Sequence, residues 1–166
     1  MKHVCLLIAL VLTGCKSTPT PTIDLQQISQ QYFSVYAKRQ DFAALMEFYA
    51  DNATFDDMIY GNQLTNKQQI SDFLNWHQGE FSLTQGQPVL EITAQVISDK
   101  EVVTRGYFNA FTYNGHPMGP WHFVIWQQFN AQGLITAQTD WINYTPRADF
   151  LGGKNLNLQL PSSINR

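Results

Sequence analysis

Apolar residues in the first third of the chain recur at helical spacing. Asp24 with Gln27 forms a capping-box pattern that opens a helix. Apolar side chains then fall on one face of it, namely Leu25, Ile28, Tyr32, Val35 and Tyr36. Two further helices are predicted, one capped by Asp41 and one opened by a capping box at Thr65. Between these two helices, residues 53–58 predict a brief strand.

After residue 80 the apolar period changes from helical to alternating. Strands are predicted over residues 89–98, 101–113, 121–130 and 134–144, with turns or loops between them. Helices that come first and are followed by an antiparallel meander indicate an α+β fold. About three N-terminal helices are therefore expected to pack on an antiparallel sheet.

The N-terminus predicts a lipoprotein. An apolar run over residues 4–12 is too short to span a bilayer as a mature helix. It ends in Leu12-Thr13-Gly14-Cys15, which resembles the bacterial lipobox. Lys16 follows in place of the aspartate that retains lipoproteins in the inner membrane. By this resemblance the chain is expected in the cell envelope, held by lipid on Cys15 in the outer membrane and facing the periplasm.

These signals divide the chain into four parts. Residues 1–14 form the lipoprotein signal peptide, and residues 15–23 comprise the lipidated Cys15 and a Pro/Thr linker that holds the domain off the membrane. Residues 24–145 form one domain, and residues 146–166 form a C-terminal tail that the pattern does not place.

Composition excludes several classes of function. Of the two cysteines, Cys5 leaves with the signal and Cys15 carries lipid, so no disulfide or thiolate site is expected. The net charge is −3 without a basic stripe, which argues against nucleic acid as a partner. The histidines lack metal-ligand spacing and no Gly-rich phosphate loop occurs, so neither a metal nor a cofactor is expected. Aromatic residues make up 13%, which suits either an aromatic core or an aromatic-lined cavity.

One segment carries the most specific resemblance. Residues 49–61 read Y-A-D-N-A-T-F-D-D-M-I-Y-G and end a strand in two adjacent acids, Asp56 and Asp57. Together with the helices, F-T-Y-N-G and F-N-A-Q-G-L-I, this segment resembles the nuclear transport factor 2-like superfamily over roughly residues 24–145. That superfamily includes SnoaL-like polyketide cyclases, ketosteroid isomerase and limonene epoxide hydrolase. The resemblance implies a cone, in which a strongly curved sheet wraps around the helices and leaves an apolar pocket.

The resemblance also implies roles for individual residues. Asp57 matches the general base of ketosteroid isomerase, and Asp56 would point away from it because neighbouring strand residues face opposite sides. The isomerase's two oxyanion donors are missing, since Phe33 and Ile125 stand at those positions. Steroid isomerisation by that mechanism is therefore not expected. Tyr36, one helical turn along, replaces the missing tyrosine only if the helix register differs.

Relatives in the SnoaL-like and epoxide hydrolase groups carry a pocket acid on the last strand, which here is Asp140. Alternation along the strands predicts further pocket residues, namely Arg105, Tyr107, Asn109, Phe111, Trp121, Phe123 and Ile125. Each acid also has a purely structural interpretation. Asp57 could cap a turn, and Asp140 could form a buried ion pair with Arg105. Asn109 could equally be a satisfied core amide.

Two functions fit these expectations. In the first, the cone binds a small, largely apolar molecule, and Asp57 transfers a proton with assistance from Asp140 and orientation by Arg105, Tyr107 and Asn109. Such chemistry would be of the isomerase, cyclase or hydratase type. In the second, the domain is a non-catalytic envelope module that binds a ligand or forms a homodimer through its sheet. The sequence leaves open whether the protein is an enzyme.

Overall fold

The computed structural model describes residues 23–83, 87–149 and 153–160. The predicted signal peptide, the lipidated Cys15 and the linker up to residue 22 lie outside the described residues. Within the described ranges, no helix is both long enough and apolar enough to cross a membrane.

The helices begin where local capping predicts. In α1 (Leu25–Lys38) the Asp24 carboxylate accepts a hydrogen bond from the backbone N–H of Gln27, and in α2 (Phe42–Met46) Asp41 accepts from Ala44. The third helix, α3 (Lys67–Leu74), starts one residue later than predicted.

That shift has a local cause. Asn66 caps α3 by accepting from the N–H of Gln69, and the Gln69 side chain reaches back to the N–H of Thr65. The cap is thus displaced by one residue from Thr65 and Gln68, and the return bond from Gln69 reaches the N–H of the residue before the N-cap. A short 3-10 helix, η1 (Trp76–Gln78), follows.

The strands form a large and a small sheet. The larger sheet has the order β2-β1-β9-β8-β5-β4, built from β1 (Tyr49–Asp57), β2 (Asn62–Leu64), β4 (Leu90–Ile97), β5 (Glu101–Phe108), β8 (Trp121–Phe129) and β9 (Ile135–Ile142). The smaller sheet has the order β3-β6-β7, built from β3 (Phe81–Leu83), β6 (Phe111–Tyr113) and β7 (His116–Met118).

The α+β prediction is confirmed, with two differences in the sheet. The large sheet is mixed, because β1 pairs parallel with β9 while its other pairs are antiparallel. The strand predicted over residues 101–113 breaks after Phe108. Asn109 then bonds back to Val89, and β6 joins the small sheet.

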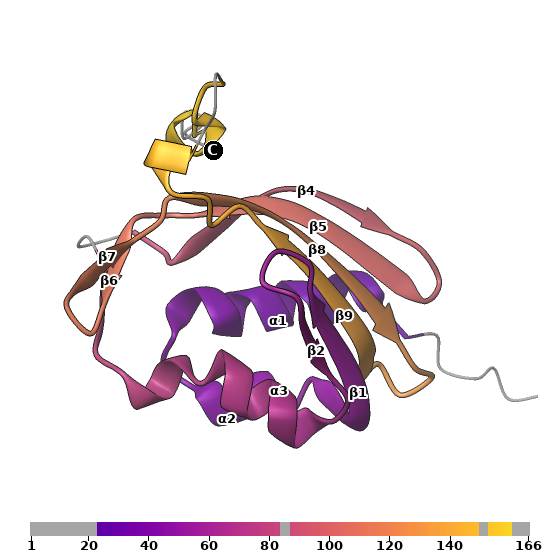
Figure 1. The fold of residues 1–166 in the computed structure, drawn as a ribbon. Coiled ribbons are helices and arrows are strands. Elements are labelled where there is room, and N and C mark those ends of the chain that lie inside the picture. Colours follow the sequence, from indigo (N-terminus) through magenta and orange to yellow (C-terminus); the bar gives the residue numbers. More distant parts are fainter. Residues whose placement is uncertain (1–22, 84–86, 150–152, 161–166) are drawn as a thin grey trace, which may run out of the picture.

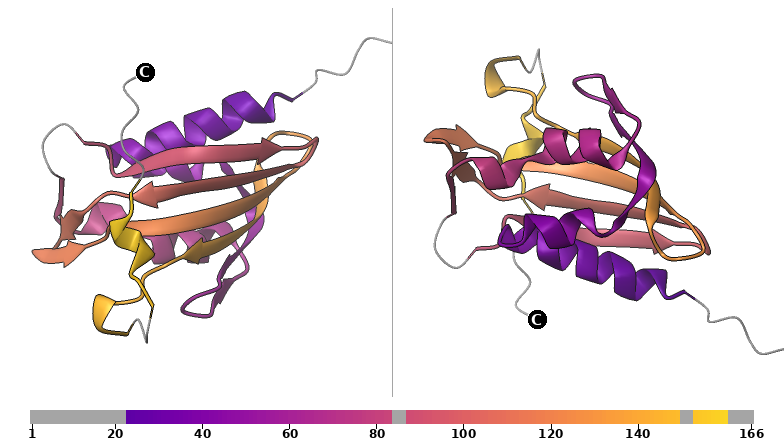
Figure 2. Two further views of the ribbon diagram at one scale, coloured as in Figure 1. Left: turned by 90° about the horizontal axis from the view of Figure 1, so that it is seen from above. Right: turned by 90° about the horizontal axis from the view of Figure 1, so that it is seen from below.

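The curved sheet wraps around α1, while α2 and α3 lie below it (Figure 1). Views from above and below show α1 running along the concave side of the strands (Figure 2). The side chains that fill the region between helix and sheet are largely aromatic. They include Tyr32, Phe33, Phe55, Phe108 and Phe123, all buried. Burial of this apolar surface is the main stabilisation of the cone.

The C-terminal segment lies on the outer face of the sheet, away from the helices (Figure 1). Its short 3-10 helix, η3 (Leu156–Leu158), is held there by Asn157. The Asn157 side chain accepts from the backbone N–H of His122 and donates to the carbonyl of Asn143. This segment therefore supports the convex side of the sheet.

Candidate functional site

Two buried carboxyl groups lie side by side inside the cone. Asp57 ends β1 and Asp140 lies opposite it on the parallel strand β9. Their side chains are 2% and 3% exposed. Asp56 is on the other face of β1 and contacts Gln63. Strand alternation therefore brings one acid from each strand to the same interior position.

Asp57 anchors a turn. One of its carboxylate oxygens accepts from the backbone N–H groups of Ile59 (3.0 Å) and Tyr60 (3.2 Å). The other oxygen accepts from the Asn62 side chain at 3.4 Å. These bonds hold the turn between β1 and β2. They match the interpretation of Asp57 as a residue that caps a turn.

Asp140 has a different environment. Burial raises the pKa of Asp140 to about 7; a hydrogen bond from Gln138 opposes the rise, and the nearby charge of Asp57 adds to it. The bond from the Gln138 amide nitrogen is 2.9 Å long. A carboxyl group with such a pKa exists in both protonation states near neutral pH, so it can accept or donate a proton.

Gln138 connects Asp140 to a buried polar network. Its side-chain oxygen accepts from the Tyr49 hydroxyl (2.8 Å) and the Gln127 amide (2.9 Å), and the Tyr32 hydroxyl oxygen lies 3.3 Å from it. The Tyr32 hydroxyl donates its one proton to the Tyr49 hydroxyl at 2.8 Å. With two donors on its oxygen, Gln138 must turn its nitrogen towards Asp140. The network thus fixes the orientation of the group that contacts the acid.

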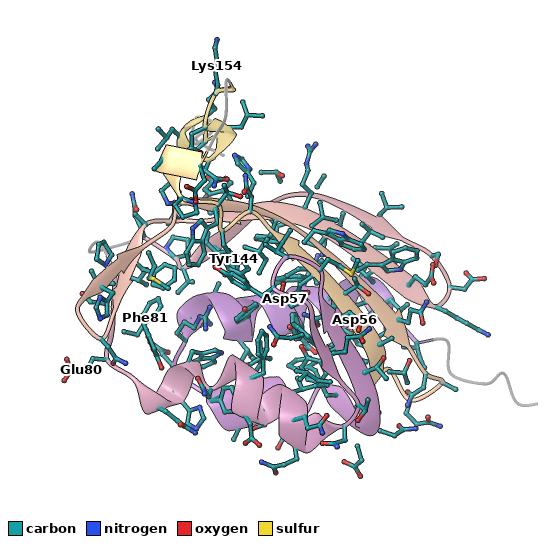
Figure 3. All side chains as sticks on the ribbon, viewed as in Figure 1. Asp56, Asp57, Glu80, Phe81, Tyr144 and Lys154 are labelled. Carbon is teal, nitrogen blue, oxygen red and sulfur yellow. The ribbon has the colours of Figure 1, made fainter. Side chains whose placement is uncertain are left out.

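A connected row of aromatic side chains, called here the aromatic rim, runs from the turn between β1 and β2 to the small sheet. It consists of Tyr60, Tyr144, Trp121, Phe111 and Phe81, each in ring contact with the next at centroid distances of 4.8–5.6 Å. Most of these side chains are partly exposed, in contrast to the buried aromatic core. Figure 3 shows Tyr144 and Asp57 in the region between sheet and helices, with Phe81 towards the small sheet.

Arg39 continues the rim at the end of α1. Its guanidinium carbon lies 4.4 Å from the ring centroid of Tyr36, 5.0 Å from that of Trp76 and 5.5 Å from that of Phe81. These distances are in the cation–π range. Tyr36 faces the interior, where Asp140 and Arg39 both influence its charge; burial is the main reason that its pKa is raised.

A sequence model of the SnoaL-like domain matches residues 29–138. The chain belongs to this family. The match includes Asp57 and ends two residues before Asp140. A search of curated protein sequences finds no match.

Solved structures with the same fold are distant in sequence. A proposed SnoaL-like polyketide cyclase from Shewanella putrefaciens CN-32 is 22% identical, with a TM-score of 0.61 over 77% of this chain and 96% of that one. A second proposed cyclase, from Shewanella denitrificans OS-217, is 20% identical, with a TM-score of 0.60 over 81% and 96%. An LEH-like epoxide hydrolase from M. tuberculosis is 12% identical, with a TM-score of 0.57 over 72% and 82%. At these identities the similarity shows the fold alone.

Four of the predicted pocket residues of this SnoaL-like domain are on the interior side. Phe123 and Ile125 are buried in the core, and Phe111 and Trp121 belong to the aromatic rim. Asn109 is a satisfied amide instead, because its nitrogen donates to the Pro88 carbonyl at 2.9 Å.

Arg105 and Tyr107 were assigned to the wrong face of their strand. Arg105 is exposed and bonds Thr93, while Tyr107 contacts His122 on the outer side. No ion pair between Arg105 and Asp140 forms. The interior positions of β5 are Val102, Thr104, Gly106 and Phe108. A glycine and a threonine do not stand out as core residues, and this misled the assignment by pattern.

A cavity of about 570 Å³ lies on the outer face of the sheet, lined by Ile59, Arg105, His122, Trp141, Asn143 and Leu156. It is on the opposite side of the sheet from Asp140. Among the described residues, no group of three His, Cys, Asp or Glu side chains is arranged to hold a metal ion.

Proposed function

We propose that this SnoaL-like domain binds a small, largely apolar molecule at the aromatic rim and transfers a proton through Asp140. The observation that carries this proposal is the environment of Asp140, a buried carboxyl group with a pKa of about 7, held by one fixed amide. Perturbed acids of this kind concentrate at functional sites. The aromatic rim supplies the apolar contacts that such a ligand needs.

The roles of the two acids follow from their bonds. Asp140, in its ionised form, is the base that removes a proton next to a carbonyl group or activates a water molecule. Asp57 positions the strand end and adds negative charge that favours the protonated form of Asp140. Tyr36 keeps its proton, because burial raises its pKa, and can donate a hydrogen bond to the ligand. Similar folds in proposed polyketide cyclases and an epoxide hydrolase support an isomerase, cyclase or hydratase type of reaction.

The test begins with native mass spectrometry of the protein purified from its own cell envelope, which identifies a bound molecule. Asp140→Asn is then expected to lower turnover of that molecule by roughly 10²–10⁴-fold, because a general base is lost, while its affinity changes little. Asp56→Asn, one residue from the site and facing outward, is the matched control and should retain full turnover. Undiminished turnover by the Asp140 variant contradicts the proposal.

A second candidate is a homodimer interface on the outer face of the sheet. Val96 is 70% exposed, Trp126 is 40% exposed and Trp141 is 37% exposed. Large exposed apolar side chains on one sheet face are typical of interaction surfaces. Light scattering should give twice the chain mass, and Trp126→Glu should halve it. A native chain that is monomeric at all concentrations tested rejects this interface.

The lipid anchor at Cys15 completes the proposal, with the domain in the outer membrane facing the periplasm. Its support is the lipobox pattern and the lysine that follows it. Fractionation of cells that express the full chain or its Cys15→Ala variant tests the anchor, because only the lipidated form should stay with the outer membrane.

A further inference from the structure

Arg39 is a half-buried cation with no anion beside it. Its Nε atom is buried and has no hydrogen-bond partner among the described residues. Within the same ranges, no carboxylate lies within 4.0 Å of its guanidinium nitrogens. Burying a charged group costs free energy unless the group is paired, and aromatic ring faces offset this cost only in part. The guanidinium interacts with the Tyr36 side chain, but its buried Nε–H is left without an acceptor.

The backbone conformation of Arg39 is a second sign that its side chain has a specific role. The residue is the C-cap of α1 and has a left-handed conformation, with φ at 52° and ψ at 31°. Glycine is the usual residue at such a position because it has no Cβ to strain. An arginine at this position is strained, whereas a glycine could end the helix without that strain. Such strain persists where the side chain has a use of its own.

A second donor without an acceptor lies next to it. The indole of Trp76 is buried against Phe42, and its ring is 5.0 Å from the Arg39 guanidinium carbon. Its Nε1 atom likewise has no partner in the part of the chain that the structure describes. Buried donors normally have acceptors, so two neighbouring unsatisfied donors indicate that an acceptor group belongs here.

We propose that the guanidinium of Arg39 binds the carboxylate of a small aromatic or alicyclic acid. The planar fork of an arginine matches a planar carboxylate in two parallel hydrogen bonds. The flat rings of Tyr36 and Phe81 suit a ring on the ligand. Among the described residues, Arg39 is the one lysine or arginine recorded over these rings, and a single such cation favours a monoanion over a phosphate dianion.

This inference rests on the proposed function, because the same ligand must reach Asp140. Arg39 lies over the Tyr36 ring, and Tyr144 belongs to the aromatic rim that Arg39 continues. A carboxylate bound at Arg39 would place the apolar body of the ligand along these tyrosines, and its reacting carbon several atoms from the carboxylate.

The test compares 2-naphthoate with its neutral analogue 2-naphthamide by titration calorimetry on the native protein. The carboxylate is expected to bind at least tenfold tighter than the amide. Arg39→Gly should abolish this preference and leave the amide affinity unchanged, since glycine fits the left-handed backbone. Arg105→Ala, which removes an exposed arginine on the outer face, is the matched control and should keep the full preference.

Arg39→Lys provides a second test in case the glycine variant does not fold. It keeps a positive charge but lacks the planar fork, so the naphthoate affinity should fall about tenfold while the amide affinity stays constant. Equal binding of both probes to the native protein overturns the carboxylate site and leaves proton transfer by Asp140 standing. Binding of neither probe overturns it as well. Failure of the proposed function alone would appear differently, as unchanged turnover in Asp140→Asn with the naphthoate preference intact in the native protein.

Discussion

Asp140→Asn is expected to be more stable than the native protein at pH 8, by up to about 4 kcal/mol, and to lose this advantage towards pH 4. Burial is the main reason that the pKa of Asp140 is raised from 3.8 to about 7. Between these values the folded state binds more protons than the unfolded state. The free energy of unfolding therefore falls as the pH rises through this window, and it levels off above pH 7. Asparagine carries no charge but still offers an oxygen to Gln138, so it avoids this loss.

Urea unfolding of both proteins at intervals from pH 4 to pH 9 measures the difference. Subtracting the two curves cancels the titration of all other groups, so a slope confined to pH 4–7 belongs to Asp140. Parallel curves for the native protein and Asp140→Asn would show that the buried acid does not titrate near neutrality.

Gly106→Ala is expected to destabilise the domain by roughly 3 kcal/mol or more. A Cβ at this position would lie 2.2 Å from the backbone oxygen of Glu91 and 2.6 Å from the Phe123 ring. The first contact is with the backbone of the neighbouring strand, so a rotamer change cannot relieve it. The second would push Phe123 out of the core. The glycine thus permits both the strand spacing and the aromatic packing inside the cone.

Urea midpoints of the variant and of Gly153→Ala provide the comparison. A Cβ at Gly153 would meet no described atom within 4 Å, so this replacement should change the unfolding free energy by less than about 0.5 kcal/mol. A Gly106→Ala midpoint as close to the native value as that of the control would mean that β4 shifts without cost.

Local chemistry made the helices predictable, whereas strand neighbours depended on the whole chain. Asp24 and Asp41 sit three residues before the N–H groups they cap, so the sequence contains the full motif. The parallel pairing of β1 with β9 has no such local signature. On β5, the orientation was misjudged because Gly106 and Thr104 face the interior while Arg105 faces outward.

The candidate site, like the sheet, was only partly predictable from the sequence. Alternation correctly turned Asp57 and Asp140 inward, but only the bonds of each carboxylate separate their roles. Tyr49 and Gln138 are 89 residues apart, so their contact could not be seen in the sequence. Arg39 looks like an ordinary basic residue at a helix end, and only its backbone conformation turns it over the rings.

The parallel pairing of β1 with β9 has a consequence for how the domain folds. The first strand can pair at once with β2, but its parallel neighbour β9 is missing until residues 135–142 have been made. Contacts between residues so distant in the chain slow folding, because the intervening loop must be ordered first. Asp57 and Asp140 therefore become neighbours late, and a chain that ends before β9 lacks the paired carboxyl groups.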